Sequence, residues 1–310
     1  MIGLLDTSIS SNNIGDKIIV ESIKAILKDI GIEAPISLPT HEPWKIKEFK
    51  HVKGIKYWIL CGTNALNSHH FFKVNSQWRL NLSQVPFLRN KVIGLGLGWW
   101  QYQGNLDFPT ALLYRTIFKD DFLHSMREDY AVKKFERIGI NSAFTSCPTM
   151  WNLPSRFDAR RDGVVTAVTF YRKDKKSDKQ LFDLLREVYG NVMLFAQSAE
   201  DIRYIKKLSV DLGSVLTNLE EFREKLQEGY GYLGTRLHAG IYALQHGRQA
   251  IVVAKDNRAI ELSRGTNLQI VLPENLTLES VAFSKKPGPL KIPYQNILNF
   301  KVQLAETVSS

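Results

Sequence analysis

An arginine and a histidine stand two residues apart in the stretch GTRLHAGIYALQHG, which runs from Gly234 to Gly247. A strand-like segment precedes the stretch and an amphipathic helix follows, so Arg236 and His238 lie at a strand-to-helix junction. The free N–H groups and the dipole of a helix N-terminus favour anions there. Arginine can bind an oxyanion through two parallel hydrogen bonds, and histidine can donate a proton near neutral pH. The pattern predicts an anion site with a proton donor beside it.

Further candidate site residues also follow predicted strands, where open parallel sheets bind their ligands. They are Asn13, Gly15 and Asp16 in SNNIGDK; Gly62, Thr63 and Asn64 in CGTN; Arg127 in HSMRED; Arg172 after VVTAVTFY; and Lys255 after QAIVVA. Together with Arg236, the three cations Arg127, Arg172 and Lys255 would hold a phosphate with a carboxylate, or a diphosphate. The structural alternatives are a helix start for SNNIGDK, a tight turn for CGTN and an ion pair for Arg127. For Arg236 and His238 the alternative is a structural arginine and a core histidine.

Glycines alternate with apolar residues in GLGLGWW, at positions 94, 96 and 98. The spacing differs from the G-x-G-x-x-G of a dinucleotide-binding loop. We interpret it as a crowded strand, because glycine in a strand often marks close approach of another group.

Composition and charge limit the classes of function. The chain has 310 residues, 44% hydrophobic and 23% charged, with a formal net charge of +10, which is typical of a globular protein with an anionic partner. We expect no nucleic acid as partner, since no nucleic-acid motif is present. Cys61 and Cys147 lack metal or disulfide spacing, so we expect no metal, no cofactor and a cytoplasmic location. The N-terminus does not resemble a secretion signal, and no apolar run reaches the ~18 residues of a membrane span.

Strand-like runs alternate with helical periodicity from end to end, which predicts an α/β fold with parallel sheets. The pattern restarts after NLPSRFDARRDG, the best candidate linker. We therefore predict two doubly wound, Rossmann-like domains, 1–152 and 163–286, and a tail, 287–310, that packs back on the first. The cleft between two such domains is the expected site. Helix starts are predicted at Ser177 and Asn218, as caps.

Four stretches, in the expected order, resemble the polysaccharide pyruvyl transferase family: NNIGDK, SMRED, TSCPTMW and GTRLHAGIYALQHGRQAIVVAKDNR. The resemblance implies a GT-B-like arrangement of the two domains with the site in the cleft. It implies phosphoenolpyruvate as donor and a pair of sugar hydroxyls as acceptor. The product would be a pyruvate ketal on a glycan or exopolysaccharide, with phosphate released. Acceptors in relatives are often lipid-linked oligosaccharides, which leaves peripheral contact with a membrane open.

The resemblance also implies roles for individual residues. Arg236 and His238 are expected to bind the donor and catalyse the reaction, with His238 as the acid. Asp16 acts as base or orients the acceptor. Arg127 and the loop residues Asn13 and Gly15 also match family motifs. From their places after strands, we assign Arg172 and Lys255 with Arg127 to donor binding, and Gly62, Thr63 and Asn64 with Asn13 and Gly15 to the acceptor loops. Many relatives carry a run of glycines where this chain has CGTN, so the acceptor is left open.

Two alternatives remain. A nucleotide-sugar glycosyltransferase of the same two-domain type would place Arg236 and Lys255 on a diphosphate and Glu261 on ribose. A relative that has lost the chemistry would bind a glycan or an anion without turnover.

Overall fold

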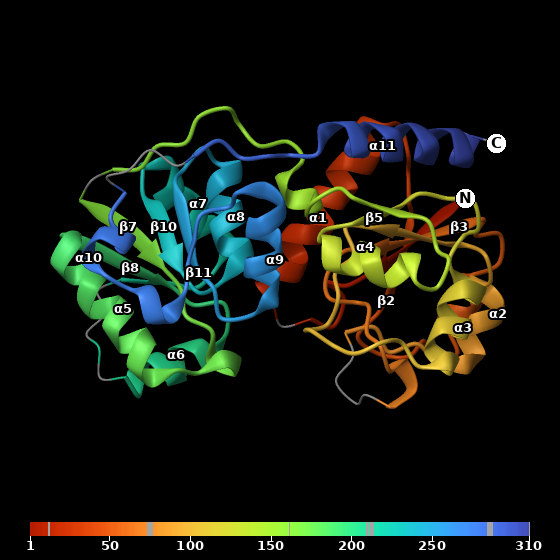
Figure 1. Ribbon diagram of the computed structural model, residues 1–310, viewed down its shortest axis with the longest axis horizontal. Coiled ribbons are helices and arrows are strands. Elements are labelled where there is room, and N and C mark those ends of the chain that lie inside the picture. The colour runs from red at the N-terminus through yellow and green to blue at the C-terminus, as the bar shows by residue number, and fades with distance from the viewer. Residues whose placement is uncertain are drawn as a thin grey trace. The chain divides into compact units, whose positions relative to one another are not determined.

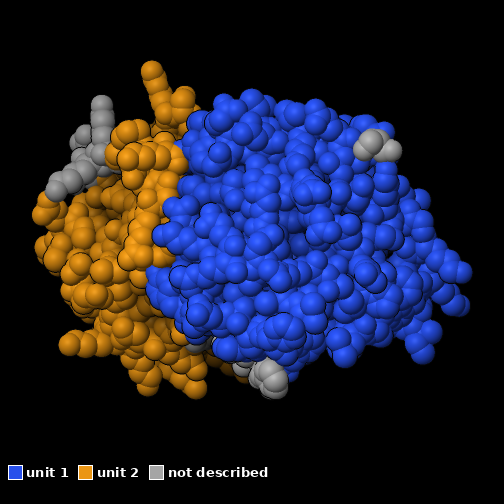
Figure 2. All heavy atoms as spheres, turned by 45° about the vertical axis from the view of Figure 1, so that its right-hand side comes forward, with its two compact units in different colours: residues 1–11, 16–151, 292–310 blue, residues 12–15, 152–291 orange. Residues whose placement is uncertain are grey.

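The computed structural model describes residues 1–11, 13–72, 77–160, 162–208, 210, 214–283 and 288–309 (Figure 1). The chain forms two compact units (Figure 2). Unit 1 comprises Met1–Ser11, Asp16–Trp151 and Ile292–Ser310, and unit 2 comprises Asn12–Gly15 and Asn152–Lys291. The predicted boundary at 286–287 lies outside the described residues. Each unit has a parallel sheet with helices, which confirms the predicted mixed α/β fold.

Unit 1 is built on a four-stranded parallel sheet in the order β2-β1-β3-β4. The strands are β1 (Ile2–Asp6), β2 (Ile36–Pro39), β3 (Tyr57–Cys61) and β4 (Val92–Leu95), and a parallel pair follows, β5 (His124–Met126) and β6 (Ser142–Phe144). The helices of four residues or more are α1 (Ile14–Asp29), α2 (Val85–Leu88), α3 (Phe108–Ile117), α4 (Asp129–Glu136) and α11 (Tyr294–Ser309). Every residue of β1 and β4 is buried, as expected for strands of a sheet covered on both faces.

Helix α11 brings the end of the chain back into unit 1. Its buried residues Ile297, Phe300 and Leu304 recur at helical spacing and form one face. The ring of Phe300 lies 5.8 Å from that of Phe122 and 5.9 Å from that of Trp151. This face of α11 is therefore part of the hydrophobic core of unit 1.

Unit 2 is built on a six-stranded parallel sheet in the order β12-β11-β10-β7-β8-β9. The strands are β7 (Gly163–Thr166), β8 (Asn191–Phe195), β9 (Val215–Leu216), β10 (Gly231–Gly234), β11 (Ala250–Val253) and β12 (Ile270–Val271). The helices are α5 (Lys175–Val188), α6 (Ala199–Lys206), α7 (Leu219–Gln227), α8 (Leu237–Gln245), α9 (Asn257–Thr266) and α10 (Leu278–Val281). Numbered from β7, the order is the 3-2-1-4-5-6 of a doubly wound sheet. The strand order reverses between β7 and β10, where such sheets bind ligands.

The helix starts of unit 2 confirm one predicted cap and correct another. Asn218 caps α7, and its side chain accepts a hydrogen bond from the Glu221 amide. Helix α5 instead begins three residues before the predicted start, with Asp174 as cap and Ser177 inside its first turn. The hydroxyl of Ser177 donates to Asp174 at 2.7 Å rather than capping a helix of its own.

Candidate functional site

Arg236 lies at the N-terminus of α8, two residues after the end of β10, and forms a buried ion pair. Its Nη2 atom donates to Oδ1 and Oδ2 of Asp201 at 2.7 and 2.6 Å. The two side chains are 7% and 1% exposed. The arginine predicted to hold a substrate anion thus already has a carboxylate partner within unit 2.

The carboxylate of Asp201 joins the segments that follow three strands. Besides Arg236 after β10, it accepts the amide of Phe170 after β7, at 3.2 Å, and the amide of Gln197 after β8, at 3.1 Å. The hydroxyl of Thr235 donates to that of Thr169 at 2.9 Å. These bonds fix the loops on both sides of the point where the strand order reverses.

His238 lies in the first turn of α8, and only 7% of it is exposed. A Cβ atom built on Gly15 would lie 3.3 Å from both Cβ and Nδ1 of His238. The amide of Gly15 donates to Oδ1 of Asn13 at 3.1 Å. The backbone at Gly15 therefore lies close to the imidazole ring, and residues 13–15 approach His238 within unit 2.

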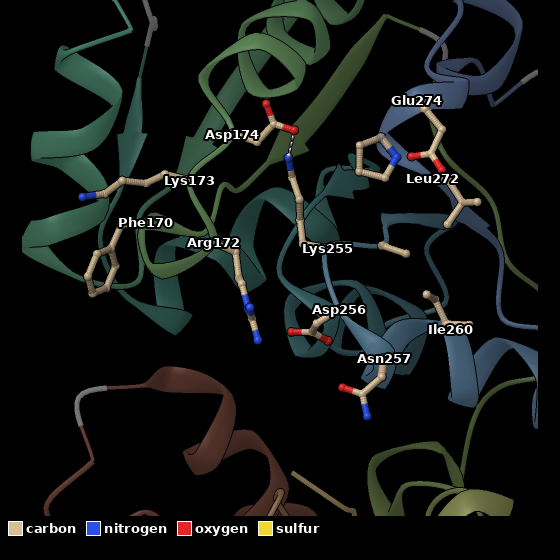
Figure 3. A pocket seen from close by; sticks show the side chains of 12 residues that line it. Phe170, Arg172, Lys173, Asp174, Lys255, Asp256, Asn257, Ile260, Leu272 and Glu274 are labelled. Atoms are coloured by element: carbon tan, nitrogen blue, oxygen red, sulfur yellow. Dashed lines mark ion pairs between the residues drawn. The ribbon is translucent and has the colours of Figure 1, made fainter. Parts of the chain in front are cut away.

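Unit 2 contains a pocket of about 860 Å³ at the carboxyl ends of β7, β11 and β12 (Figure 3). Its lining combines basic, acidic and apolar side chains: Phe170, Arg172, Lys173, Asp174, Ala254, Lys255, Asp256, Asn257, Ile260, Leu272, Pro273 and Glu274. Two of the predicted donor-binding residues, Arg172 and Lys255, line the pocket. Glu261, the carboxylate considered for a ribose, does not, and it pairs with Arg264 at 2.6 Å.

The Lys255 ammonium is surrounded by groups from the first turn of α5. Its Nζ atom donates to Ser177 Oγ at 2.5 Å and lies 3.1 Å from Asp178 and 3.5 Å from Asp174 (Figure 3). Hydrogen bonds from Ser177, supported by the charge of Lys255, hold the pKa of Asp174 below its usual range. Two carboxylates therefore offset the charge of Lys255.

Arg172 contrasts with Lys255, because within the described ranges its guanidinium makes no ion pair. It points into the pocket beside Asp256 and Asn257 (Figure 3). Burial would raise the pKa of Asp256, but the charge and hydrogen bonds of Arg258, with a smaller effect from Arg172, keep it below its usual range. Asn257 is 7% exposed, and its Nδ2 atom has no hydrogen-bond partner among the described residues. Arg172 and Asn257 thus keep hydrogen-bond donors that no described residue uses.

Unit 1 gathers a second polar cluster around Asp16, in the first turn of α1. Ser11 Oγ donates to Asp16 Oδ2 at 2.5 Å, and Thr63 Oγ1 lies 3.4 Å from Oδ1. The Nε2 atom of His41 lies 3.6 Å from Oδ2. His41 was not among the predicted residues, although it follows β2 as the predicted residues follow their own strands. The cluster also contains Gln77, which accepts from Thr63 at 2.6 Å.

Arg127 follows β5 and is 3% exposed. Its guanidinium donates to Asn64 Oδ1 and lies 3.7 Å from Glu128. A Cβ atom on Gly98 would lie 2.3 Å from Arg127 Nε. The structure thus joins the predicted acceptor residue Asn64 to Arg127 and uses Gly98 to make room for that arginine.

The other two glycines of GLGLGWW are equally crowded. Added Cβ atoms would lie 2.6 Å from the Leu97 side chain at Gly94 and 2.1 Å from Pro148 at Gly96. The interpretation as close approach is confirmed, although β4 ends at Leu95 and only Gly94 lies within it.

In the described residues, no helix combines the length and apolar character that a membrane span requires.

Comparison with known proteins identifies a family. The family model described as polysaccharide pyruvyl transferase matches residues 13–257. Among solved structures, the chain is similar to the UDP-GlcNAc 2-epimerase from Methanocaldococcus jannaschii, with 10% identity, a TM-score of 0.57 and coverage of 100% of this chain and 99% of that one. A likeness at this identity concerns the fold. A search of curated proteins gives no match.

Proposed function

Because the chain belongs to the polysaccharide pyruvyl transferase family, we propose that it transfers pyruvate from phosphoenolpyruvate to a pair of sugar hydroxyls as a ketal. The family match carries this proposal, since it includes Asp16, the Arg236–His238 junction and the pocket-lining residues of unit 2 from Phe170 to Asn257. We further propose that the two units form a GT-B-like pair with the donor on unit 2 and the acceptor on unit 1. The acceptor is a sugar or a carrier-linked oligosaccharide.

The donor carries a phosphate and a carboxylate, and arginine suits both groups without a metal. Arg172 and Lys173 are the cations of the pocket that make no ion pair with the described residues, and the Nζ atom of Lys173 lies 5.9 Å from the ring of Tyr204. We assign Arg172 to a donor oxyanion, with the Asn257 amide as a second hydrogen-bond donor. Lys255 and Arg236 have a supporting role in the site. The Asp178 carboxylate fixes the position of Lys255, and the Asp201 carboxylate fixes that of Arg236.

The proposed reaction balances in protons. An acid, assigned to His238, delivers a proton to the methylene carbon of the donor, and positive charge develops on the neighbouring carbon. One sugar hydroxyl attacks that carbon and loses its proton. Phosphate then leaves with its C–O bonding pair, and the second hydroxyl closes the ketal ring and loses its proton. One of the two released protons restores the acid, and the other accompanies phosphate. Arg172 stabilises the charge on the leaving phosphate.

Donor binding tests the assignment. Isothermal titration should show phosphoenolpyruvate binding to the wild type and about 10–100-fold weaker binding to Arg172→Ala, because a hydrogen bond to a charged group contributes roughly 1.5–3 kcal/mol. The matched control is Lys179→Ala, an exposed lysine of α5 that does not line the pocket, which should bind within about twofold of wild type. Binding of uridine diphosphate without phosphoenolpyruvate would favour glycosyl transfer. Binding of neither would favour a relative without turnover.

A further inference from the structure

His41 and Asp16 face each other at the carboxyl edge of the unit 1 sheet. His41 follows β2 and Asp16 follows β1, and these two strands are hydrogen-bonded neighbours. The His41 Nε2 atom lies 3.6 Å from Asp16 Oδ2, and the side chains are 20% and 4% exposed. The topology thus holds an imidazole against a nearly buried carboxylate where parallel sheets bind their ligands.

The hydrogen bonds around Asp16 leave part of its carboxylate unused. Thr63 has one hydroxyl proton, and that proton is directed to Gln77, whose Oε1 lies 2.6 Å away, whereas Asp16 Oδ1 lies at 3.4 Å. Gln77 Oε1 also accepts from the Asn64 amide at 2.9 Å, which fixes it as an acceptor. Asp16 therefore keeps a strong bond from Ser11, at 2.5 Å, and acceptor capacity for a charged partner.

The imidazole of His41 is turned so that one nitrogen faces this carboxylate. Its Nε2 atom is buried and has no hydrogen-bond partner among the described residues, while the side chain as a whole is one-fifth exposed. Part of the side chain therefore reaches solvent. A neutral ring with its proton on Nε2, toward Asp16, carries its lone pair on Nδ1.

We propose that His41 is the base that removes the proton from the attacking sugar hydroxyl, with Asp16 as its positioning residue. The inference rests on the proposed function. His41 Nδ1 takes the hydroxyl proton as the oxygen bonds to the donor carbon, and the imidazolium is stabilised by the Asp16 carboxylate 3.6 Å from Nε2. When phosphate leaves, the imidazolium returns its proton to phosphate or water. The assignment places the base in the unit proposed to hold the acceptor.

A second histidine–aspartate pair in unit 1 shows a different arrangement. His69 Nδ1 lies 3.0 Å from Asp107 Oδ2. Asp107 also caps α3 by accepting the Thr110 amide at 2.8 Å, so both of its oxygens are in use. This pair fastens a loop to a helix start, and it serves as the matched control.

The test measures phosphate release from phosphoenolpyruvate with methyl pyranosides of the common hexoses and N-acetylhexosamines. For the acceptor that supports turnover, His41→Gln should lower kcat by roughly 100-fold or more, with KM for phosphoenolpyruvate within about twofold of wild type. His41→Gly should regain at least about tenfold in kcat when imidazole is added, because the open site admits a free base. His69→Gln should keep kcat within about threefold of wild type.

The outcomes separate the two proposals. Wild type that releases no phosphate with any acceptor overturns the proposed function and this inference with it. Active wild type with an active His41→Gln variant overturns the inference alone. An equal fall in the kcat of His69→Gln, or a kcat of His41→Gly that does not recover with imidazole, identifies His41 as a structural residue. Either result also overturns the inference.

Discussion

One nitrogen of Arg236 donates to both carboxylate oxygens of Asp201, and both side chains are buried. The pair joins the N-terminus of α8 to that of α6. It converts an arginine that the sequence offers as a free anion ligand into a fixed part of unit 2. Its energetic consequence is large, because removing one partner of a buried pair leaves an uncompensated charge.

We expect Asp201→Ala to lower the free energy of unfolding by about 3–5 kcal/mol, because it leaves the Arg236 charge and two loop amides without their carboxylate partner. Urea unfolding followed by circular dichroism measures the change. The adjacent Glu200→Ala is the control, since Glu200 pairs with Arg203 on the surface and should change stability by less than about 0.5–1 kcal/mol. Equal effects of the two variants would contradict a buried pair.

His124 should make unit 1 sensitive to acid. Its ring is fully buried in a neutral form, with the Gly94 amide donating to Nδ1 and Nε2 3.2 Å from the Lys119 carbonyl. Burial lowers its pKa to about 3. Between that pKa and the ~6.5 of an unfolded histidine, only the unfolded state binds the proton. The contribution of His124 to the free energy of unfolding is therefore fully present above pH ~6.5 and decreases as the pH is lowered.

From His124 alone, we expect the free energy of unfolding to be about 2 kcal/mol lower at pH 5 than at pH 7. Urea unfolding at both pH values should therefore show a smaller difference in this free energy for His124→Gln than for wild type, whatever the stability of the variant at pH 7. His51→Gln, which changes an exposed histidine, should keep the wild-type difference. An unchanged difference in His124→Gln would contradict the neutral buried ring.

The C-terminal helix should contribute to the stability of unit 1. Phe300→Ala removes a ring that is 0% exposed and should cost about 3–5 kcal/mol. Leu298→Ala, on the same helix but 54% exposed, should change stability by less than about 0.5 kcal/mol. Urea unfolding of both variants gives the comparison, and a small effect of Phe300→Ala would show that α11 does not belong to the core.

The parts of this structure that depend on local pattern were predictable, and those that depend on distant partners were not. The parallel sheets and the Asn218 cap follow from periodicity and local hydrogen bonding. The pairing of Arg236 with Asp201 joins residues 35 positions apart, and nothing near Arg236 in the sequence indicates it. The Lys255–Ser177 bond spans 78 positions and was hidden for the same reason.

The misplaced start of α5 had a local cause. Asp174 lies three residues before Ser177 and is an equally good cap. His41 was missed because the short strand before it, ISLP, has little apolar periodicity. The rule that polar residues after strands form sites would have included it.

The most direct test of pyruvyl transfer follows phosphoenolpyruvate labelled with ¹³C at its methylene carbon, incubated in deuterated water with the enzyme and the sugar panel. The account predicts that the alkene signal is replaced by a ketal methyl signal carrying one deuteron, with one phosphate released per ketal formed. Phosphate released with free pyruvate and no ketal, or a donor left intact while a nucleotide sugar is consumed, would contradict it.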